Sequence, residues 1–313
     1  MSRVLTALRS RWVRIGFLLA ALAAGVWAVA SQWDDVRTAL TSIPGGVVVG
    51  ALALSVAYVV LTMAAWRVLL MDLGSPLRVG AASRVFFVSQ VGKYIPGGVW
   101  NVLAAAEMGA DHAIPRRRSI SVMVVSILVS ILTGLALAVL AIVLAPAGVA
   151  ADFGWVGWFL PVLLLVLAPP VLNRLLGLAL RLARRPPLER PLTLGGVVRA
   201  SLWSTAAWIV AGVQVWLLSA ALGLELTVAT LALAVGGYAL AWTVGFLVVV
   251  VPAGVGVREA VLAAVLATHL EPGAVVVVVL LSRVLLTVAD VVLGLAGLAV
   301  GRRSGTGSLT PSS

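Results

Sequence analysis

Lys93 is the only lysine of the chain, and every other basic residue except the two histidines is arginine. It lies in a polar interruption of an apolar sequence, residues 89–101, together with Tyr94, Trp100 and Asn101. A charged group at membrane depth is costly unless it pairs or faces water, so it is a functional candidate by default. We expect Lys93 to contact a lipid phosphate; the alternative is that it pairs with a neighbouring group or snorkels.

Further charged residues lie in apolar stretches and could line the same polar pocket. They are Arg84 and Glu107 beside the first interruption, Arg258 and Glu259 in a second one, and Arg283 and Asp290 near the C-terminus. Arg84 could equally be an interfacial anchor. We expect Glu107 to cap a helix or form an ion pair near the cytoplasmic rim.

Helical spacing and the helix dipole suggest how some of these charges pair. Arg283 and Asp290 are seven residues apart, so a helix presents both on one face, as an ion pair or as substrate contacts. Arg258 would start a helix, where the dipole disfavours a cation. A compensating anion is therefore expected there, either Glu259 or a bound phosphate.

Proline and glycine account for both interruptions. The helix-breaking residues are Pro96, Gly97 and Gly98 in the first and Pro252, Gly254 and Gly256 in the second, residues 251–259. Proline removes a backbone donor, and glycine allows backbone angles that other residues resist. Free backbone groups within a membrane require surrounding protein or a water-filled cavity, and paired breaks in two halves point to a transporter's binding site. The backbone amides of residues 97–99 would add donors for an anion.

Composition predicts an all-α polytopic membrane protein. The 313 residues are 62% hydrophobic and 11% charged, far from the roughly 45–50% and about 25% of soluble domains. The absence of cysteine excludes disulfides and thiolate chemistry, and two scattered histidines make a zinc cluster implausible, so we expect no cofactor and no metal. The formal charge of +11 comes from arginines beside apolar spans, which indicates membrane topology and anionic headgroups rather than a nucleic-acid partner.

Hydropathy and the distribution of arginine predict about six spanning helices and two re-entrant hairpins. The spans are residues 15–30, 46–71, 119–144, 155–180, 195–222 and 274–300. The fourth contains prolines at 161, 169 and 170, and the stretch 168–170 is expected only to kink it. The hairpins are residues 79–112 and 227–270, which enter from opposite sides. With this count both termini are cytoplasmic. A rival topology remains, because residues 227–250 are long enough to span.

These elements form one domain, residues 1–303, with two inverted halves at about 46–144 and 195–300. Inverted halves with a site at their interface are a known plan of transporters. Residues 304–313 are polar and are expected to be a disordered cytoplasmic tail.

The two interruptions, together with Ser282 and Arg283, resemble the lysylphosphatidylglycerol synthase transmembrane-region family. This is the flippase-like domain of the multiple peptide resistance factor, and the likeness covers roughly residues 11–303. The matching positions are Lys93, Pro96, Gly97, Gly98, Pro252, Gly254, Gly256, Arg258, Glu259 and Arg283. The resemblance implies lipid translocation. The resistance factors carry a soluble aminoacyl-transferring domain after the membrane part, whereas this sequence ends ten residues after Arg303, so we expect no synthesis of lysylphosphatidylglycerol.

We therefore expect a lipid flippase or transporter of the bacterial cytoplasmic membrane, not an enzyme, that moves an anionic or aminoacylated phospholipid or related amphiphile. Lys93, Arg258 and Arg283 would hold an anionic headgroup, and Glu259 and Asp290 would organise these cations or meet a cationic headgroup. No nucleotide-binding motif occurs, so a gradient, the membrane potential or downhill scrambling would drive movement. Alternatives are an accessory protein of a lipid-linked glycan or envelope pathway, and a small-anion transporter. A homo-oligomer is possible.

Overall fold

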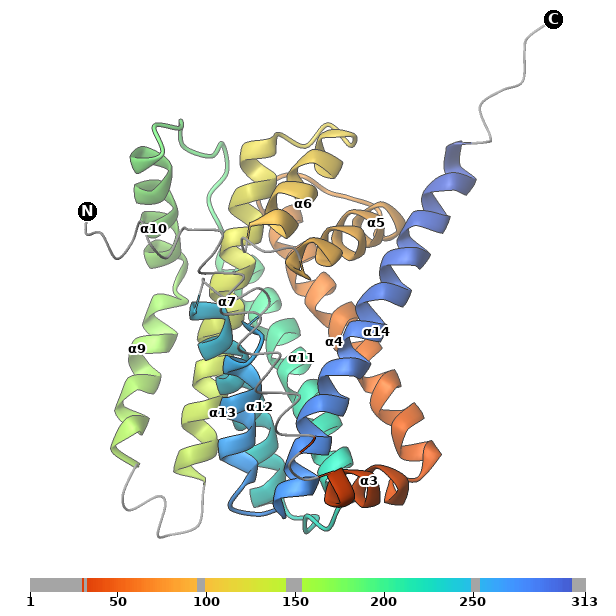
Figure 1. The fold of residues 1–313 in the computed structure, drawn as a ribbon. Coiled ribbons are helices and arrows are strands. Elements are labelled where there is room, and N and C mark those ends of the chain that lie inside the picture. Colours follow the sequence, from red (N-terminus) through yellow and green to blue (C-terminus); the bar gives the residue numbers. More distant parts are fainter. Residues whose placement is uncertain (1–29, 31–32, 95–98, 145–153, 249–253, 306–313) are drawn as a thin grey trace, which may run out of the picture.

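The computed structural model describes residue 30 and residues 33–94, 99–144, 154–248 and 254–305 (Figure 1). Every regular element within these ranges is a helix, which confirms the all-α fold class. Several predictions fall outside the described residues: nearly all of the first span, the breaks at Pro96, Gly97, Gly98 and Pro252, and most of the tail.

Five helices in the described ranges are long and apolar enough to cross a membrane, or up to six if a bent pair counts as one span. They are α4 (Gly45–Asp72), α7 (Arg116–Val143), α11 (Leu194–Ala220), α12 (Val228–Leu247) and α14 (Pro272–Gly305). Four of them, α4, α7, α11 and α14, match predicted spans closely. The chain is therefore a multi-pass membrane protein.

The predicted span 155–180 is not one continuous helix. It consists of the short 3-10 helix η2 (Gly154–Trp158), α9 (Phe159–Val166) and α10 (Pro169–Leu182), and the chain bends by 70° between α9 and α10. Proline lacks the amide hydrogen that a continuing helix needs but is well suited to the first turn of a new one. The two prolines at 169 and 170 therefore begin α10, with Ala168 in an extended conformation before them, instead of only kinking a span.

The first predicted hairpin is built from α5 (Val79–Gln90), η1 (Val91–Tyr94) and α6 (Trp100–Ala110). α5 and α6 pack against each other and lie at the end of the bundle where α4 ends and α7 begins (Figure 1). At 1.5 Å per residue, neither arm is long enough to cross the ~30 Å of a bilayer core. These lengths agree with a pair of arms that enters and leaves at the same end, and the re-entrant assignment of this segment stays a prediction.

The second hairpin consists of α12 and α13 (Val257–Leu266), which also pack against each other. It lies at the opposite end of the bundle, where α11 ends and α14 begins (Figure 1). α12 alone is long enough to span, so the re-entrant assignment of this segment and the inverted repeat both stay predictions. The order helix, hairpin, helix is nevertheless the same in α4–α7 and in α11–α14.

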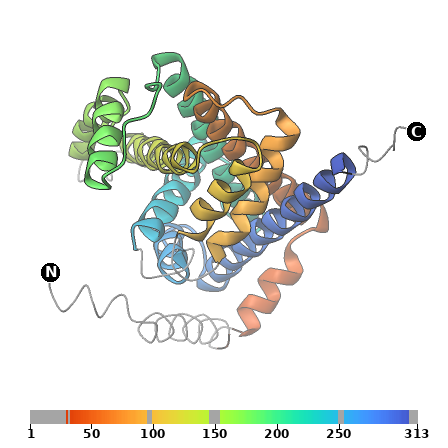
Figure 2. The same cartoon turned by 90° about the horizontal axis from the view of Figure 1, so that it is seen from above.

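Close helix contacts hold the two hairpins between the long helices. A Cβ atom at Gly236 of α12 would lie 3.2 Å from the Ala138 backbone of α7, and one at Gly212 of α11 would lie 2.4 Å from Val235. Small residues allow such close approach in membranes, where apolar burial between helices gives little driving force. Seen from above, α9 and α10 lie at the periphery beside α7, and α14 runs along α5 (Figure 2). The short helix α3 (Trp33–Ser42) packs on α14.

Candidate functional site

A polar cavity of about 200 Å³ lies where the two hairpins meet inside the bundle. Residues from both hairpins and from α4, α7 and α14 line it. The polar ones are Tyr58, Thr62, Gln90, Lys93, Tyr94, Asn101, Ser126, Ser130, Arg258, Arg283 and Asp290. Six of the predicted substrate contacts are therefore brought together from segments that are far apart in the sequence.

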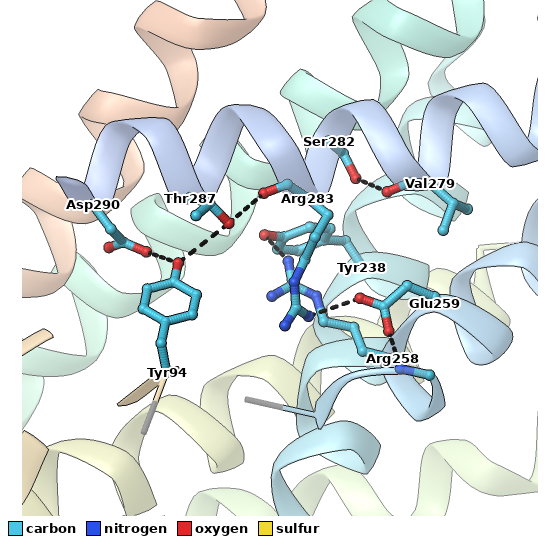
Figure 3. Close-up of polar contacts among 10 residues, drawn as sticks. Tyr94, Tyr238, Arg258, Glu259, Val279, Ser282, Arg283, Thr287 and Asp290 are labelled. Atoms are coloured by element: carbon cyan, nitrogen blue, oxygen red, sulfur yellow. Dashed lines mark hydrogen bonds and ion pairs between the residues drawn. The ribbon is translucent and has the colours of Figure 1, made fainter. Parts of the chain in front are cut away.

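The first hairpin is joined to α14 through Asp290. The Lys93 ammonium nitrogen lies 2.6 Å from Oδ2 of Asp290, and the Tyr94 hydroxyl donates a hydrogen bond of 2.6 Å to the same oxygen (Figure 3). Asp290 is almost fully buried, and its second oxygen, Oδ1, has no hydrogen-bond partner among the described groups. Lys93 therefore pairs with Asp290 in the structure, as one of the two alternatives for this lysine expected, and the pair lines the cavity.

The second hairpin is joined to α14 through Glu259. Its Oε1 accepts a hydrogen bond of 2.7 Å from Nη1 of Arg283, and its Oε2 accepts one of 2.6 Å from the backbone amide of Gly256 (Figure 3). One carboxylate therefore pairs with a cation on α14 and also caps the first turn of α13. A carboxylate is favoured at this place because free amides and the helix dipole gather at the N-terminus.

Arg258 is buried against Tyr238. The residue is 7% exposed. Its guanidinium lies 4.6 Å from the centre of the Tyr238 ring and donates a hydrogen bond to the Tyr238 hydroxyl. Within the described ranges, no carboxylate lies at ion-pairing distance from it. A buried cation is costly unless it is paired, and the neutral phenol does not neutralise it.

These contacts bear on two alternatives that the sequence left open. Glu259 forms its ion pair with Arg283 and not with Arg258, because neighbouring residues on a helix point about 100° apart. Arg283 and Asp290 do share a face of α14, as the spacing predicted, but they do not pair with each other (Figure 3). Two helical turns separate them by about 10 Å along the axis, so each reaches a different hairpin.

Glycine conformations explain how the second break places Arg258. Gly254 and Gly256 have φ angles of +67° and +86°, which side-chain-bearing residues rarely adopt. A Cβ atom on Gly254 would also lie 3.0 Å from the backbone of Gly245 on α12. The chain can therefore turn tightly against the end of α12 and start α13 with Arg258 directed at Tyr238. These positive φ angles agree with a helix break at the two glycines, and their role as a hinge stays a prediction.

Other predicted residues lie away from the cavity. Arg84 packs against α14 near Gly297, with a buried Nε that has no hydrogen-bond partner among the described groups, and Trp100 lines a groove on the outer side of the hairpin. Glu107 accepts hydrogen bonds of 2.8 and 2.6 Å from Arg116, so its predicted ion pair is confirmed. The amides of Gly97 and Gly98 lie outside the described residues.

Two tyrosines of the site were missed in the sequence, Tyr58 on the cavity wall and Tyr238 beside Arg258. The chain has only three tyrosines, and the third is Tyr94. Tyr58 and Tyr94 line the cavity, and Tyr238 contacts Arg258, which lines it too. The same rarity that drew attention to Lys93 could have found them.

A family model described as the lysylphosphatidylglycerol synthase TM region matches residues 13–294. The chain belongs to this family. The match includes both hairpins and every charged residue of the cavity, so the site lies within the part that the family shares. No curated protein matches the chain with statistical significance.

In this member of the family the charged groups of the site do not balance. Lys93, Arg258 and Arg283 bring three positive charges, and Glu259 and Asp290 bring two negative ones. Each carboxylate is already shared with one cation, and the excess charge resides on Arg258. The arrangement can bind an anion whose oxygens accept hydrogen bonds from a guanidinium, such as a phosphate group.

Proposed function

We propose that this protein is a lipid flippase that moves an anionic or aminoacylated phospholipid, or a related amphiphile, across the bacterial cytoplasmic membrane. Membership of a membrane-domain family named for a lipid synthase supports a role with lipids. The polar residues that line the cavity are cations, phenols, hydroxyls, two amides and the carboxylate of Asp290, which is paired with Lys93, and this set suits binding of a charged headgroup. We further propose that both termini are cytoplasmic, in keeping with the arginines near each end.

The observation that carries the proposal is the buried, unneutralised guanidinium of Arg258 at a cavity between two hairpins. The free energy of burying such a charge is offset when an anion binds beside it. An entering phosphate would be met by Arg258 and Arg283, which lie close together, and by Lys93, which also lines the cavity (Figure 3). Because the last two already have carboxylate partners, the phosphate would compete with Asp290 and Glu259 for them.

This competition suggests how the headgroup passes. A phosphate that draws Lys93 from Asp290 loosens the contact between the first hairpin and α14, and one that draws Arg283 from Glu259 loosens the second hairpin. The two contacts lie two helical turns apart on one face of α14, which carries Arg283 and Asp290 (Figure 3). Opening them in turn would expose the same site first to one side of the membrane and then to the other, while the acyl chains stay in lipid.

The test is reconstitution into liposomes with fluorescent phosphatidylglycerol and phosphatidylcholine, followed by dithionite quenching of the outer leaflet. We expect wild-type protein to translocate phosphatidylglycerol faster than protein-free vesicles do, and Arg258→Gln to slow this about tenfold or more. Arg199→Gln is a matched control, because Arg199 is exposed and bonds only within its own helix. Gel filtration of each variant separates loss of transport from loss of fold.

A small-anion transporter is the second candidate, because a cavity of about 200 Å³ is large enough for a free phosphate-sized ion. Uptake of inorganic phosphate into the same liposomes distinguishes the two. Phosphate uptake without movement of any fluorescent lipid would favour this candidate over the flippase.

A further inference from the structure

An apolar groove of about 600 Å³ lies on the outer side of the first hairpin, between η1, α6 and α14. Val91, Trp100, Leu103, Leu295 and Leu298 line it, and each of these side chains is at least 44% exposed. The only charged residue on its lining is Glu107, which is paired with Arg116. A hydrocarbon chain is therefore the ligand whose chemistry matches this groove.

The groove and the polar cavity share one wall. At three places, consecutive residues line first one space and then the other: Gly92 and Lys93, Trp100 and Asn101, and Val291 and Asp290. The groove-facing member of each pair is uncharged, and the cavity-facing member is polar or charged. The two spaces therefore lie on opposite sides of η1, the start of α6 and one turn of α14.

This wall is thin where it separates the two spaces. A Cβ atom on Gly92 would lie 2.8 Å from the backbone nitrogen of Asn101, and one on Gly294 would lie 3.1 Å from the Val91 side chain. Besides the packing of Val91 on Gly294, η1 is joined to α14 by the bonds of Lys93 and Tyr94 to Asp290 and by a longer hydrogen bond of 3.4 Å from Tyr94 to Thr287. If these bonds open, the polar cavity and the apolar groove become continuous.

We propose that the groove holds an acyl chain of the lipid whose headgroup occupies the cavity, and that the headgroup enters between η1 and α14, past the Lys93–Asp290 pair. This inference rests on the proposed function and adds to it the side from which the lipid enters. It also fixes the substrate class as an amphiphile whose polar and apolar parts lie on opposite sides of η1.

The occupant must be selected by its headgroup rather than by its chain. Lipid tails are as apolar as the groove, so moving a chain from the bilayer into it yields little hydrophobic free energy. An ordinary bilayer lipid would therefore visit the groove in proportion to its abundance. A lipid held by its phosphate at Arg258 would keep its chain there for longer, and the groove would be enriched in that lipid.

The chain has no cysteine, so single cysteines can be labelled without background. We would attach a bimane fluorophore to Leu295→Cys, in the groove, and to Val292→Cys, which is also exposed on α14 but lies outside it. The labelled proteins are placed in phosphatidylcholine vesicles that contain a small fraction of brominated phosphatidylglycerol or of brominated phosphatidylcholine. Bromine quenches on contact, so the signal reports which lipid chain touches each position.

At position 295 we expect brominated phosphatidylglycerol to quench about twofold more than brominated phosphatidylcholine, a preference of about 0.4 kcal/mol. At position 292 the two lipids should quench equally. Adding Arg258→Gln to Leu295→Cys should abolish the preference without changing quenching by phosphatidylcholine. Equal quenching by both lipids at position 295 would overturn the inference, because the groove would then hold bulk lipid only.

A second variant keeps the test independent of the buried arginine. Leu295→Trp places an indole in the groove from an exposed position, and Val292→Trp places one on the exposed surface of α14 outside the groove. We expect Leu295→Trp to slow translocation of phosphatidylglycerol about tenfold, whereas Val292→Trp leaves it unchanged. Translocation that is normal in Leu295→Trp but lost in Arg258→Gln would overturn the groove and leave the flippase intact. Absence of translocation in wild type would instead contradict the flippase itself.

Discussion

The two hairpins contact the same face of α14 through ion pairs of opposite polarity. The first hairpin supplies the cation, Lys93, and α14 supplies the anion, Asp290; the second hairpin supplies the anion, Glu259, and α14 supplies the cation, Arg283. The two tyrosines at these contacts also have opposite hydrogen-bonding roles. Tyr94 donates its hydroxyl hydrogen to a carboxylate, whereas Tyr238 accepts a hydrogen bond from a guanidinium.

The two contacts also differ in how firmly they are anchored. Glu259 is bound to Arg283 and to the amide that starts α13, next to glycines packed tightly on α12. Lys93 keeps 27% of its side-chain surface exposed and lies on a short 3-10 turn. We therefore expect the first hairpin to separate from α14 at lower free-energy cost than the second. The first hairpin is also the one that lines the apolar groove.

The largest loss of stability is expected from Glu259→Ala. It leaves Arg283 unpaired near Arg258 and removes the cap of α13 in one step. Breaking a buried pair costs about 3–5 kcal/mol, and since these side chains remain 17% and 20% exposed, we expect about 3 kcal/mol. The thermal unfolding midpoint in detergent measures this. Glu259→Gln keeps an acceptor for Gly256 and should lose less; equal losses would show that the cap contributes nothing.

A smaller loss is expected from Asp290→Asn, about 2 kcal/mol, because Lys93 can still reach water in the cavity. The double variant Lys93→Met, Asp290→Asn should recover part of that loss, since it leaves no unpaired charge. A double-mutant cycle on the unfolding midpoints gives the coupling. Strict additivity would mean that the pair does not join η1 to α14, and the comparison between the hairpins would fail.

Removing one tyrosine hydroxyl from each contact tests the same difference between the two hairpins. Tyr238→Phe removes the acceptor that we observe for the Arg258 guanidinium, and we expect a loss of about 1.5 kcal/mol. Tyr94→Phe should cost less, about 0.5–1 kcal/mol, because Asp290 keeps Lys93. Thermal unfolding of the two variants side by side gives the order. The reverse order would indicate that Tyr94, and not Lys93, provides the main bond to Asp290.

Much of the fold could be predicted because apolar length and arginine placement directly reflect the membrane. α4, α7, α11 and α14 begin and end within a few residues of their predicted bounds. The exception, α9 and α10, arose because a proline pair can either kink a helix or start a new one, and sequence alone does not decide which. α12 stays ambiguous for a related reason, since its length suits both a span and a long hairpin arm.

The members of the site could be predicted more readily than their partners. Charges are rare in apolar sequence, so Lys93, Arg283 and Asp290 stand out. Partner choice depends on which helices adjoin and how each is rotated, and spacing along one helix does not contain that information. This is why the sequence left the anion beside Arg258 open between Glu259 and a bound phosphate, and why Tyr238, on a different helix, was missed.

The smallest effect is expected from Glu107→Gln, which removes a carboxylate from the same hairpin as Lys93 without touching the cavity. Glu107 and Arg116 form two short hydrogen bonds, yet their side chains are 64% and 62% exposed, and exposed pairs contribute little because water and salt replace them. We expect no measurable change in the unfolding midpoint or in lipid translocation. If Glu107→Gln lowered the unfolding midpoint as much as Asp290→Asn does, burial would not determine how much an ion pair of the first hairpin contributes to stability.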